Sequence, residues 1–165
     1  MPVPVQKPGR SEQTFVTPHA FIAATKRLLQ IDAFAFDFAA SCCNTQASQY
    51  FDDATDAMVF SGKGWAERVV GGWGWLNPPY TDIEPWVERC KDAKRAGAHI
   101  ALLVPASVGA DWFRDHVDGH AQVKFLNGRL GFLPDQPKAL YPKDCILCLY
   151  GARPGYAVWS WRTQP

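Results

Sequence analysis

Four consecutive residues, Asn77, Pro78, Pro79 and Tyr80, combine groups that can hold a planar amino group for reaction at its nitrogen. The lone pair of such a nitrogen is delocalised into its ring, so the nitrogen is a poor nucleophile. Acceptors placed on its two N–H groups draw it toward tetrahedral geometry and act by orientation. The Asn77 side-chain oxygen is one acceptor, and the Pro78 carbonyl is another because Pro79 has no N–H to donate back. The ring of Tyr80 can stack on the base that carries the amino group.

The tetrapeptide follows residues 73–76, which we predict to form a strand that the two prolines end. A helix should begin directly afterwards with Asp82 as its N-cap, because that register keeps Pro85 in the first turn, whereas a Thr81 cap would not. Its core-facing residues recur at helical spacing, as Ile83, Trp86, Val87 and Cys90. The four reactive groups would then lie at the carboxyl end of a strand, where open α/β sheets bind their ligands.

The rest of the chain alternates between predicted strands and helices. Thr17 and Pro18 predict the start of a helix, with Thr17 as its N-cap. Apolar runs predict strands at residues 33–38, 99–105, 122–126 and 145–150. We also expect a short strand at 50–51, a glycine-rich loop at 61–72 and a helix at 111–117. This alternation predicts an α/β fold with a mostly parallel sheet and helices on both faces.

The bulk composition fits one domain. The chain has 165 residues, is 47% hydrophobic and 20% charged, and carries a formal net charge of +1. We expect residues 1–14, which are rich in proline and polar residues, to form a flexible arm, and residues 15–165 to form a single domain. The small net charge means that any DNA-binding surface must be local or supplied by a partner.

No apolar run is long enough to predict a membrane span, and no secretory signal opens the chain. We therefore expect a cytoplasmic protein whose five cysteines are reduced. Cys145 and Cys148 have the spacing of a zinc half-site, but strand residues three apart point to opposite faces, and no second pair completes four ligands. We accordingly expect no metal. The near-neutral charge and the aromatic content permit a homodimer without requiring one.

A series of single residues and short motifs follows a characteristic order along most of the chain. They are Thr17-Pro18, Phe36 to Ser41, Asn44, Tyr50-Phe51, Asp56, Trp75 to Tyr80, Trp86, Leu103 to Pro105, Trp112 and Gly128 to Phe132. This order resembles the phage-encoded DNA adenine-N6 methyltransferase family, the compact Dam-like enzymes of bacteriophages and prophages. The tetrapeptide itself resembles the Asp/Asn/Ser-Pro-Pro-Tyr/Phe/Trp motif of amino-methyltransferases. The resemblance covers about residues 15 to 150.

The resemblance implies a Rossmann-like methyltransferase fold that uses S-adenosylmethionine as cofactor and methylates N6 of adenine in DNA. It also implies a phage or prophage origin, DNA modification that protects against restriction, and action in the host cytoplasm. The catalytic residues that it implies are Asn77, Pro78, Pro79 and Tyr80. The residues expected at the cofactor are Thr17, Pro18, Asp37, Ala39, Ala40, Ser41 and Asn77. Those expected at the DNA are Tyr80, Trp112 in the base pocket and Arg129 on a phosphate at the rim.

A methyl donor with a ribose also needs a carboxylate for two hydroxyl groups. Asp52, Asp53 and Asp56 follow the expected second strand and are the candidates, although each could be a solvated loop acid. Asp37 could equally hold a turn. The chain has Ala39-Ala40-Ser41 in place of the Gly-x-Gly that follows the first strand in larger methyltransferases, as the compact family commonly does. It departs from that family in having Ala35 where a second carboxylate is usual, and the Cys42-Cys43 pair is also unusual. These departures leave a weakened or inactive homologue open.

Three alternatives therefore stand beside DNA adenine methylation. The amino target could be cytosine N4, an RNA adenine or a glutamine amide, since all present a conjugated NH2 group. The chain could instead be a degenerate methyltransferase fold that binds DNA or a protein partner. A zinc module is the weakest alternative on ligand count. Basic clusters, including Lys91, Lys94 and Arg95, are either DNA-backbone contacts or a solvated face.

Overall fold

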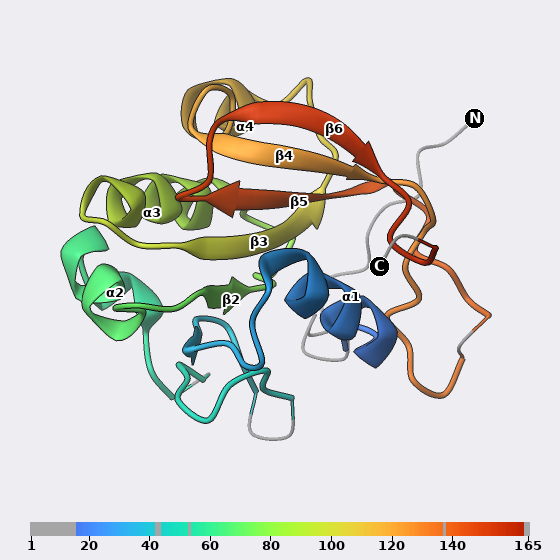
Figure 1. The fold of residues 1–165 in the computed structure, drawn as a ribbon, viewed down its shortest axis with the longest axis horizontal. Coiled ribbons are helices and arrows are strands. Elements are labelled where there is room, and N and C mark those ends of the chain that lie inside the picture. Colours follow the sequence, from blue (N-terminus) through green and yellow to red (C-terminus); the bar gives the residue numbers. More distant parts are fainter. Residues whose placement is uncertain (1–15, 42–43, 53, 137, 164–165) are drawn as a thin grey trace.

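A computed structural model describes residues 16–41, 44–52, 54–136 and 138–163 of the chain. The predicted arm at residues 1–14 lies outside the described residues, and so do Asp53 and the Cys42-Cys43 pair. The described residues form a mixed α/β structure in which one sheet separates two layers of helices (Figure 1).

The sheet has six strands in the order β1-β2-β3-β5-β4-β6. Their bounds are β1 Phe36–Asp37, β2 Gly74–Leu76, β3 Ile100–Pro105, β4 Ala121–Leu126, β5 Cys145–Tyr150 and β6 Gly155–Trp159. β1 pairs with β2, β2 with β3 and β4 with β6 in parallel, whereas β5 is antiparallel to both of its neighbours, β3 and β4. β5 is therefore the one strand of this sheet that runs in reverse, and the carboxyl ends of β1, β2 and β3 meet at one edge.

Helices cover both faces of the sheet, as the alternation of elements predicts. They are α1 His19–Leu29, α2 Gly62–Arg68, α3 Glu84–Arg95 and α4 Asp111–His116, together with the short 3-10 helix η2 Ala57–Val59. In β3, Ile100 and Leu102 pack in the core cluster with α2, α3 and α4, whereas Ala101 and Leu103 pack in the cluster with α1. This alternation explains why β3 is buried at every position.

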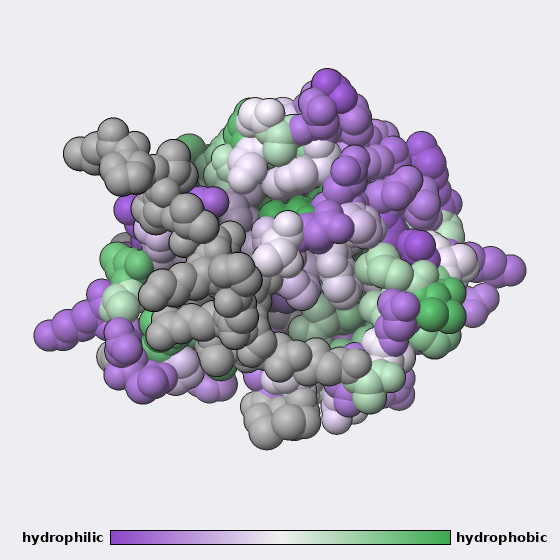
Figure 2. All heavy atoms as spheres, turned by 180° about the vertical axis from the view of Figure 1, so that it is seen from behind, coloured by the Kyte–Doolittle hydropathy of each residue, from purple (hydrophilic) through white to green (hydrophobic). Residues whose placement is uncertain are grey.

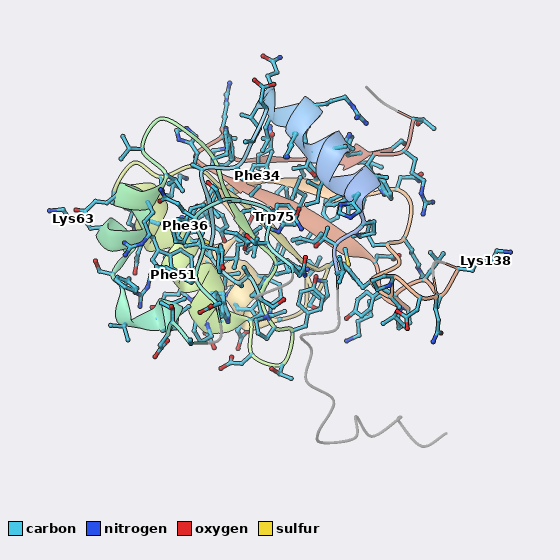
Figure 3. All side chains as sticks on the ribbon, turned by 90° about the horizontal axis from the view of Figure 1, so that it is seen from below. Phe34, Phe36, Phe51, Lys63, Trp75 and Lys138 are labelled. Atoms are coloured by element: carbon cyan, nitrogen blue, oxygen red, sulfur yellow. The ribbon has the colours of Figure 1, made fainter. Side chains whose placement is uncertain are left out.

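Aromatic side chains fill much of both core layers. Phe36, Phe51 and Trp75 lie in the interior, whereas Lys63 and Lys138 extend outward at opposite ends of the molecule (Figure 3). The rear face is largely hydrophilic, and hydrophobic side chains appear there in small, separated groups (Figure 2). Such scattered apolar groups are normal for a protein surface.

Several predicted boundaries are confirmed and others are wrong. β3 and β5 match their apolar runs closely, because continuous burial leaves a clear pattern. The strand predicted at 33–38 is reduced to the two residues of β1, and that predicted at 50–51 is only a bridge between Asp37 and Tyr50. β6 was not predicted. It is an edge strand in which the three central residues are exposed, so no hydrophobic pattern marks it.

The predicted loop at residues 61–72 is wrong, because most of it forms α2. The Ser61 hydroxyl accepts a hydrogen bond from the Gly64 N–H at 3.1 Å and so caps the helix. Trp65 is buried between the elements, and its indole N–H donates to the Ala57 carbonyl at 3.1 Å. Tertiary packing therefore stabilises a helix that its two glycines and its short length would not favour alone.

Both predicted helix caps are displaced by one residue. α1 has Pro18 as its N-cap, and the Pro18 carbonyl accepts from the N–H groups of Phe21 and Ile22, so Thr17 does not cap the helix. α3 has Ile83 rather than Asp82 as its N-cap, although Pro85 lies in the first turn as expected. The Thr17 hydroxyl is consequently available for a different contact.

The close approach of α2 to α3 yields a stability prediction. A Cβ atom at Gly62 would lie 2.6 Å from the backbone carbon of Asp92, whereas one at Gly64 would meet only ordinary contacts from 3.5 Å. We expect Gly62→Ala to lower the free energy of unfolding by about 1–3 kcal/mol through overpacking. Gly64→Ala, the matched control in the same helix, should be neutral or raise it by about 0.5–1 kcal/mol. Urea denaturation measures both, and equal effects of the two changes would contradict the packing argument.

Candidate active site

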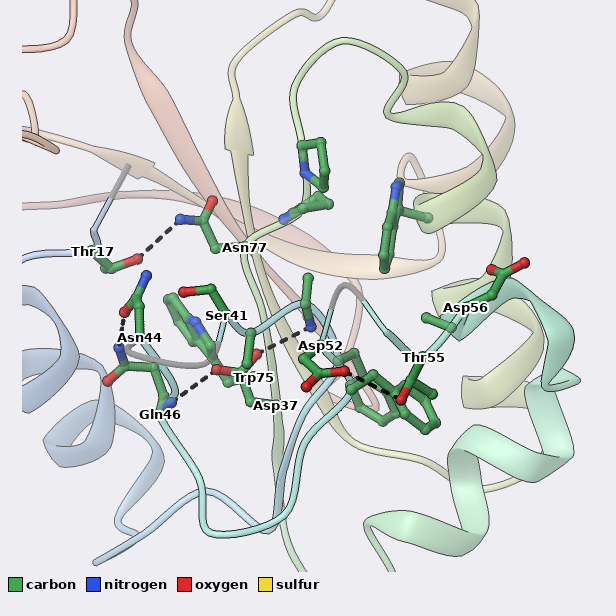
Figure 4. A pocket seen from close by; sticks show the side chains of 18 of the residues that line it. Thr17, Asp37, Ser41, Asn44, Gln46, Asp52, Thr55, Asp56, Trp75 and Asn77 are labelled. Atoms are coloured by element: carbon green, nitrogen blue, oxygen red, sulfur yellow. Dashed lines mark hydrogen bonds between the residues drawn. The ribbon is translucent and has the colours of Figure 1, made fainter. Parts of the chain in front are cut away.

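A cleft opens at the edge of the sheet where β1 and β2 end, with a cavity volume of about 240 Å³ (Figure 4). Its walls come from three regions that are distant in sequence: the start of α1, the segment from β1 to η2, and the segment from β2 into α3. The lining residues are Thr17, Asp37, Phe38, Ala39, Ala40, Ser41, Asn44, Gln46, Phe51, Asp52, Thr55, Asp56, Ala57, Trp75, Asn77, Pro78, Pro79, Tyr80 and Trp86.

Asp37 is the last residue of β1 and is almost completely buried, with 2% of its surface exposed. One carboxylate oxygen accepts from the Ala39 N–H at 3.2 Å and the other from the Gln46 N–H at 2.8 Å. Burial raises the pKa of the Asp37 carboxyl to about 6, although both N–H bonds act to lower it. The side chain therefore holds the backbone at Ala39 and at Gln46 and also places a desolvated acid in the cleft.

Asn77 directly follows β2, and both ends of its side-chain amide are held. Its Nδ2 donates to Thr17 Oγ1 at 3.0 Å, and its Oδ1 accepts from the Tyr80 hydroxyl at 2.8 Å. The same hydroxyl lies 3.4 Å from the Leu103 carbonyl. The Tyr80 ring also packs against Phe132, with ring centroids 6.3 Å apart. The amide is thus oriented by neighbours from α1's N-terminal side and from its own turn.

Asp52 and Asp56 are the two described candidates for the carboxylate that binds the donor ribose, and they make different local hydrogen bonds. Asp52 Oδ1 accepts from the Ala54 N–H at 3.1 Å and lies 3.4 Å from the Thr55 hydroxyl. Asp56 Oδ1 accepts from the Met58 N–H at 2.9 Å and so caps η2. In Figure 4 the Asp56 carboxylate points away from Asp37. Both carboxylates thus make local bonds, and only the direction of the Asp56 side chain, away from Asp37, favours Asp52 as the candidate.

The structure brings most of the predicted site residues together in this cleft. Those that line it are Thr17, Asp37, Ala39, Ala40, Ser41, Asp52, Asp56, Asn77, Pro78, Pro79 and Tyr80. Pro18, Trp112 and Arg129 do not line it. Trp112 packs against the core cluster beside Phe113. Arg129 borders a separate hollow with Pro105 to Ser107 and donates to Asp144 at 3.0 Å. It thus lies near the carboxyl end of β3, on the same edge of the sheet as Asn77.

Seven polar or aromatic residues of the cleft were not predicted as site residues. They are Phe38, Asn44, Gln46, Phe51, Thr55, Trp75 and Trp86. Gln46 matters through its backbone N–H, which binds Asp37, and no side-chain pattern could reveal such a contact. Trp86 was expected in the core. It is only half-buried and also lines the cleft, which its place in the first turn after the tetrapeptide could have suggested.

Two other sequence features are located away from this chemistry. Lys91 and Lys94 donate to the carbonyls of Asp115 and His120, so both ammonium groups are already tied to the α4 region. Cys145 and Cys148 lie in opposite core layers, as the strand period predicts. Within the described ranges, no three His, Cys, Asp or Glu residues are grouped to hold a metal ion.

No described helix is long and apolar enough to cross a membrane.

The sheet and its cleft define an α/β protein that presents an acid and an oriented amide acceptor at the carboxyl edge of parallel strands. The chain matches the family DNA N-6-adenine-methyltransferase (Dam) over residues 6–144, and it belongs to that family. The match spans β1, β2 and β3 and therefore the whole of the described cleft. No curated protein matches the chain.

The buried acid predicts a specific dependence of stability on pH. Because the pKa of Asp37 rises from 3.8 to about 6 on folding, the folded state binds more protons between these values. The stabilisation from this group is complete below the lower value and is lost as the pH rises through about 6. Relative to Asp37→Asn, the wild-type free energy of unfolding should therefore fall by up to about 3 kcal/mol between about pH 4 and pH 7.

Denaturant titrations of both proteins across this range measure the change. The hydrogen bond that Asn cannot accept adds an offset that does not vary with pH, so only the slope is diagnostic. A difference between the two proteins that stays constant with pH would contradict the raised pKa.

Proposed function

We propose that this protein transfers a methyl group from S-adenosylmethionine to N6 of adenine in DNA. The observation that carries the proposal is the oriented Asn77 amide, whose oxygen lies in the same cleft as the buried Asp37. Family membership supports the same target. By resemblance we further propose a Rossmann-like methyltransferase fold, a phage or prophage origin, a role in protecting DNA from restriction, and the host cytoplasm as the place of action.

The chemistry of the cleft suits this donor. When bound, S-adenosylmethionine supplies an electrophilic methyl group on a sulfonium centre. The carboxylates of Asp37 and Asp52 can attract its positive groups and accept from its hydroxyls. The half-buried ring of Trp86 offers stacking area for a flat heterocycle, whereas Phe38 and Phe51 are buried and support the cleft from the core. The buried acid would gain a cationic neighbour, which favours its ionised form.

The tetrapeptide would hold the amino group. Asn77 Oδ1 has two lone pairs, and the Tyr80 hydroxyl uses one, so the other can accept from an N6–H. The Pro78 carbonyl can accept from the second N–H, because Pro79 has no N–H to compete for it. Both acceptors draw the nitrogen toward the geometry needed for attack. The extruded base would stack on the Tyr80 ring, as enzymes that flip bases require.

No covalent bond to the protein is needed for this reaction. The thiols of Cys90, Cys145 and Cys148 are buried, and burial raises the pKa of each. Buried neutral thiols are inert as nucleophiles, which fits direct transfer. DNA would approach the same edge of the sheet, and Arg129 could meet a phosphate there if it left Asp144.

Removal of the central acceptor tests the proposal. We expect Asn77→Ala to reduce formation of N6-methyladenine at least about 100-fold, since the loss combines an acceptor and its orientation. The melting temperature should change little, because Asn77 is only half-buried. Asn127→Ala, at an exposed asparagine outside the cleft, is the matched control and should retain full activity.

Mass spectrometry of nucleosides from DNA and RNA of expressing cells gives the readout. N4-methylcytosine in DNA, or N6-methyladenine confined to RNA, would replace the target proposed here. Unmodified nucleic acids would favour a degenerate fold that binds DNA or a partner. Calorimetry with S-adenosylmethionine separates that case, because a cleft that never binds the donor cannot transfer its methyl group.

The same calorimetry decides between the two ribose candidates. We expect Asp52→Asn to weaken donor binding about tenfold, as loss of one charge-assisted hydrogen bond would. Asp56→Asn should change the affinity little, because the Asp56 carboxylate points away from Asp37 (Figure 4). Asp32→Asn, at an exposed acid outside the cleft, is the control. A larger effect at Asp56 than at Asp52 would reverse the assignment.

A further inference from the structure

Thr17 has a contact that neither a helix cap nor a donor ligand explains. Its side chain is 2% exposed, and its hydroxyl accepts from Asn77 Nδ2 at 3.0 Å, across 60 residues of sequence. α1 uses Pro18 as its N-cap and makes no side-chain cap bond. Among the described residues, the hydrogen-bond partner of this hydroxyl is the amide of the tetrapeptide (Figure 4).

The amide of an asparagine needs such a contact. The torsion that turns its plane is soft and has two nearly equivalent settings, so the amide does not fix its own direction. Thr17 holds the nitrogen end and the Tyr80 hydroxyl holds the oxygen end at 2.8 Å. A hydroxyl can donate or accept, so both hydroxyls would still bond to the amide if its two ends were exchanged. What they fix is the plane and the place of the amide, because one bond ties it to Thr17 beside α1 and the other to Tyr80 in its own turn.

The side chain and the backbone of Thr17 have little conformational freedom. A β-branched side chain has few χ1 settings, and a residue before proline is restricted to extended backbone. On its other side, the Val16 N–H donates to the Phe132 carbonyl at 2.9 Å. The hydroxyl thus has a fixed place relative to β2, which a positioning group requires.

We propose that Thr17 is a positioning residue, which holds the plane of the Asn77 amide in place and so acts on the rate of methyl transfer rather than on donor affinity. This inference rests on the proposed function for its kinetic consequence. The expectation that Thr17 binds the cofactor makes the opposite prediction, since loss of a ligand contact weakens donor binding first. The two roles are therefore separable by experiment.

The test compares three variants. Thr17→Val keeps the shape and removes the hydroxyl, so kcat should fall about tenfold, as loss of one net hydrogen bond would cause. The donor Kd should stay within about twofold, because the carboxylates that bind it are untouched. Thr17→Ser restores the hydroxyl and should recover kcat to within about threefold of the wild type. Thr25→Val is the matched control, since Thr25 is a fully buried threonine that donates to the Phe21 carbonyl within α1.

The outcomes distinguish this inference from the proposed function. A raised donor Kd with unchanged kcat in Thr17→Val overturns the positioning role, and so does an equal loss of kcat in Thr25→Val. The side-chain NH2 signals of Asn77 in a nitrogen-15 NMR spectrum give a readout that needs no activity. They should shift in Thr17→Val and not in Thr25→Val. If the wild type methylates nothing, the function fails, and these signals still decide whether Thr17 holds the amide.

Discussion

The pairing of β2 with β1 on one side and β3 on the other determines where every group of the cleft lies. Only three residues long, β2 is buried throughout and has parallel partners on both sides. Because the three strands run the same way, Asp37, Asn77 and Pro105 all leave the sheet at one edge. Pro78 and Pro79 then end the pairing of β2, because neither has an N–H to donate to a neighbouring strand. The side chain of Asn77 is therefore left at the edge of the sheet, in the cleft. A reversed β1 or β3 would carry its end groups to the opposite edge.

The parts of this arrangement that could be predicted from the sequence are those that local residue types determine. Continuous apolar runs marked β3 and β5, and the prolines marked the end of β2. Prediction from the sequence failed where tertiary contacts decide the structure. α2 exists because Trp65 packs between elements, and its glycines suggested a loop. The same limit applies to the cleft, since the partner of Thr17 is 60 residues away and Gln46 acts through its backbone.

The electrostatic character of the cleft follows from where Asp37 sits. Among the described residues, its carboxylate has backbone N–H groups as its hydrogen-bond partners, and burial holds its pKa at about 6. Ionisation in a desolvated site costs free energy unless a positive group compensates. The site is therefore better matched to a cationic ligand than to a neutral one of the same shape. The buried carboxylate of Asp37 therefore lowers the stability of the free protein while it raises the affinity for a cationic ligand. Such a trade-off is common at binding sites that are formed before the ligand arrives.

The reversed strand β5 has a consequence for synthesis of the chain. β5 lies between β3 and β4 and supplies the hydrogen-bonding partners of both, yet it is made after both. Until it emerges, β3 has one unpaired edge, and all six of its residues are of a kind that the finished protein buries completely. Such an edge is a template for pairing with other chains. During translation the nascent protein therefore depends on late closure of the sheet, and its exposure to aggregation ends only when Cys145–Tyr150 takes its place.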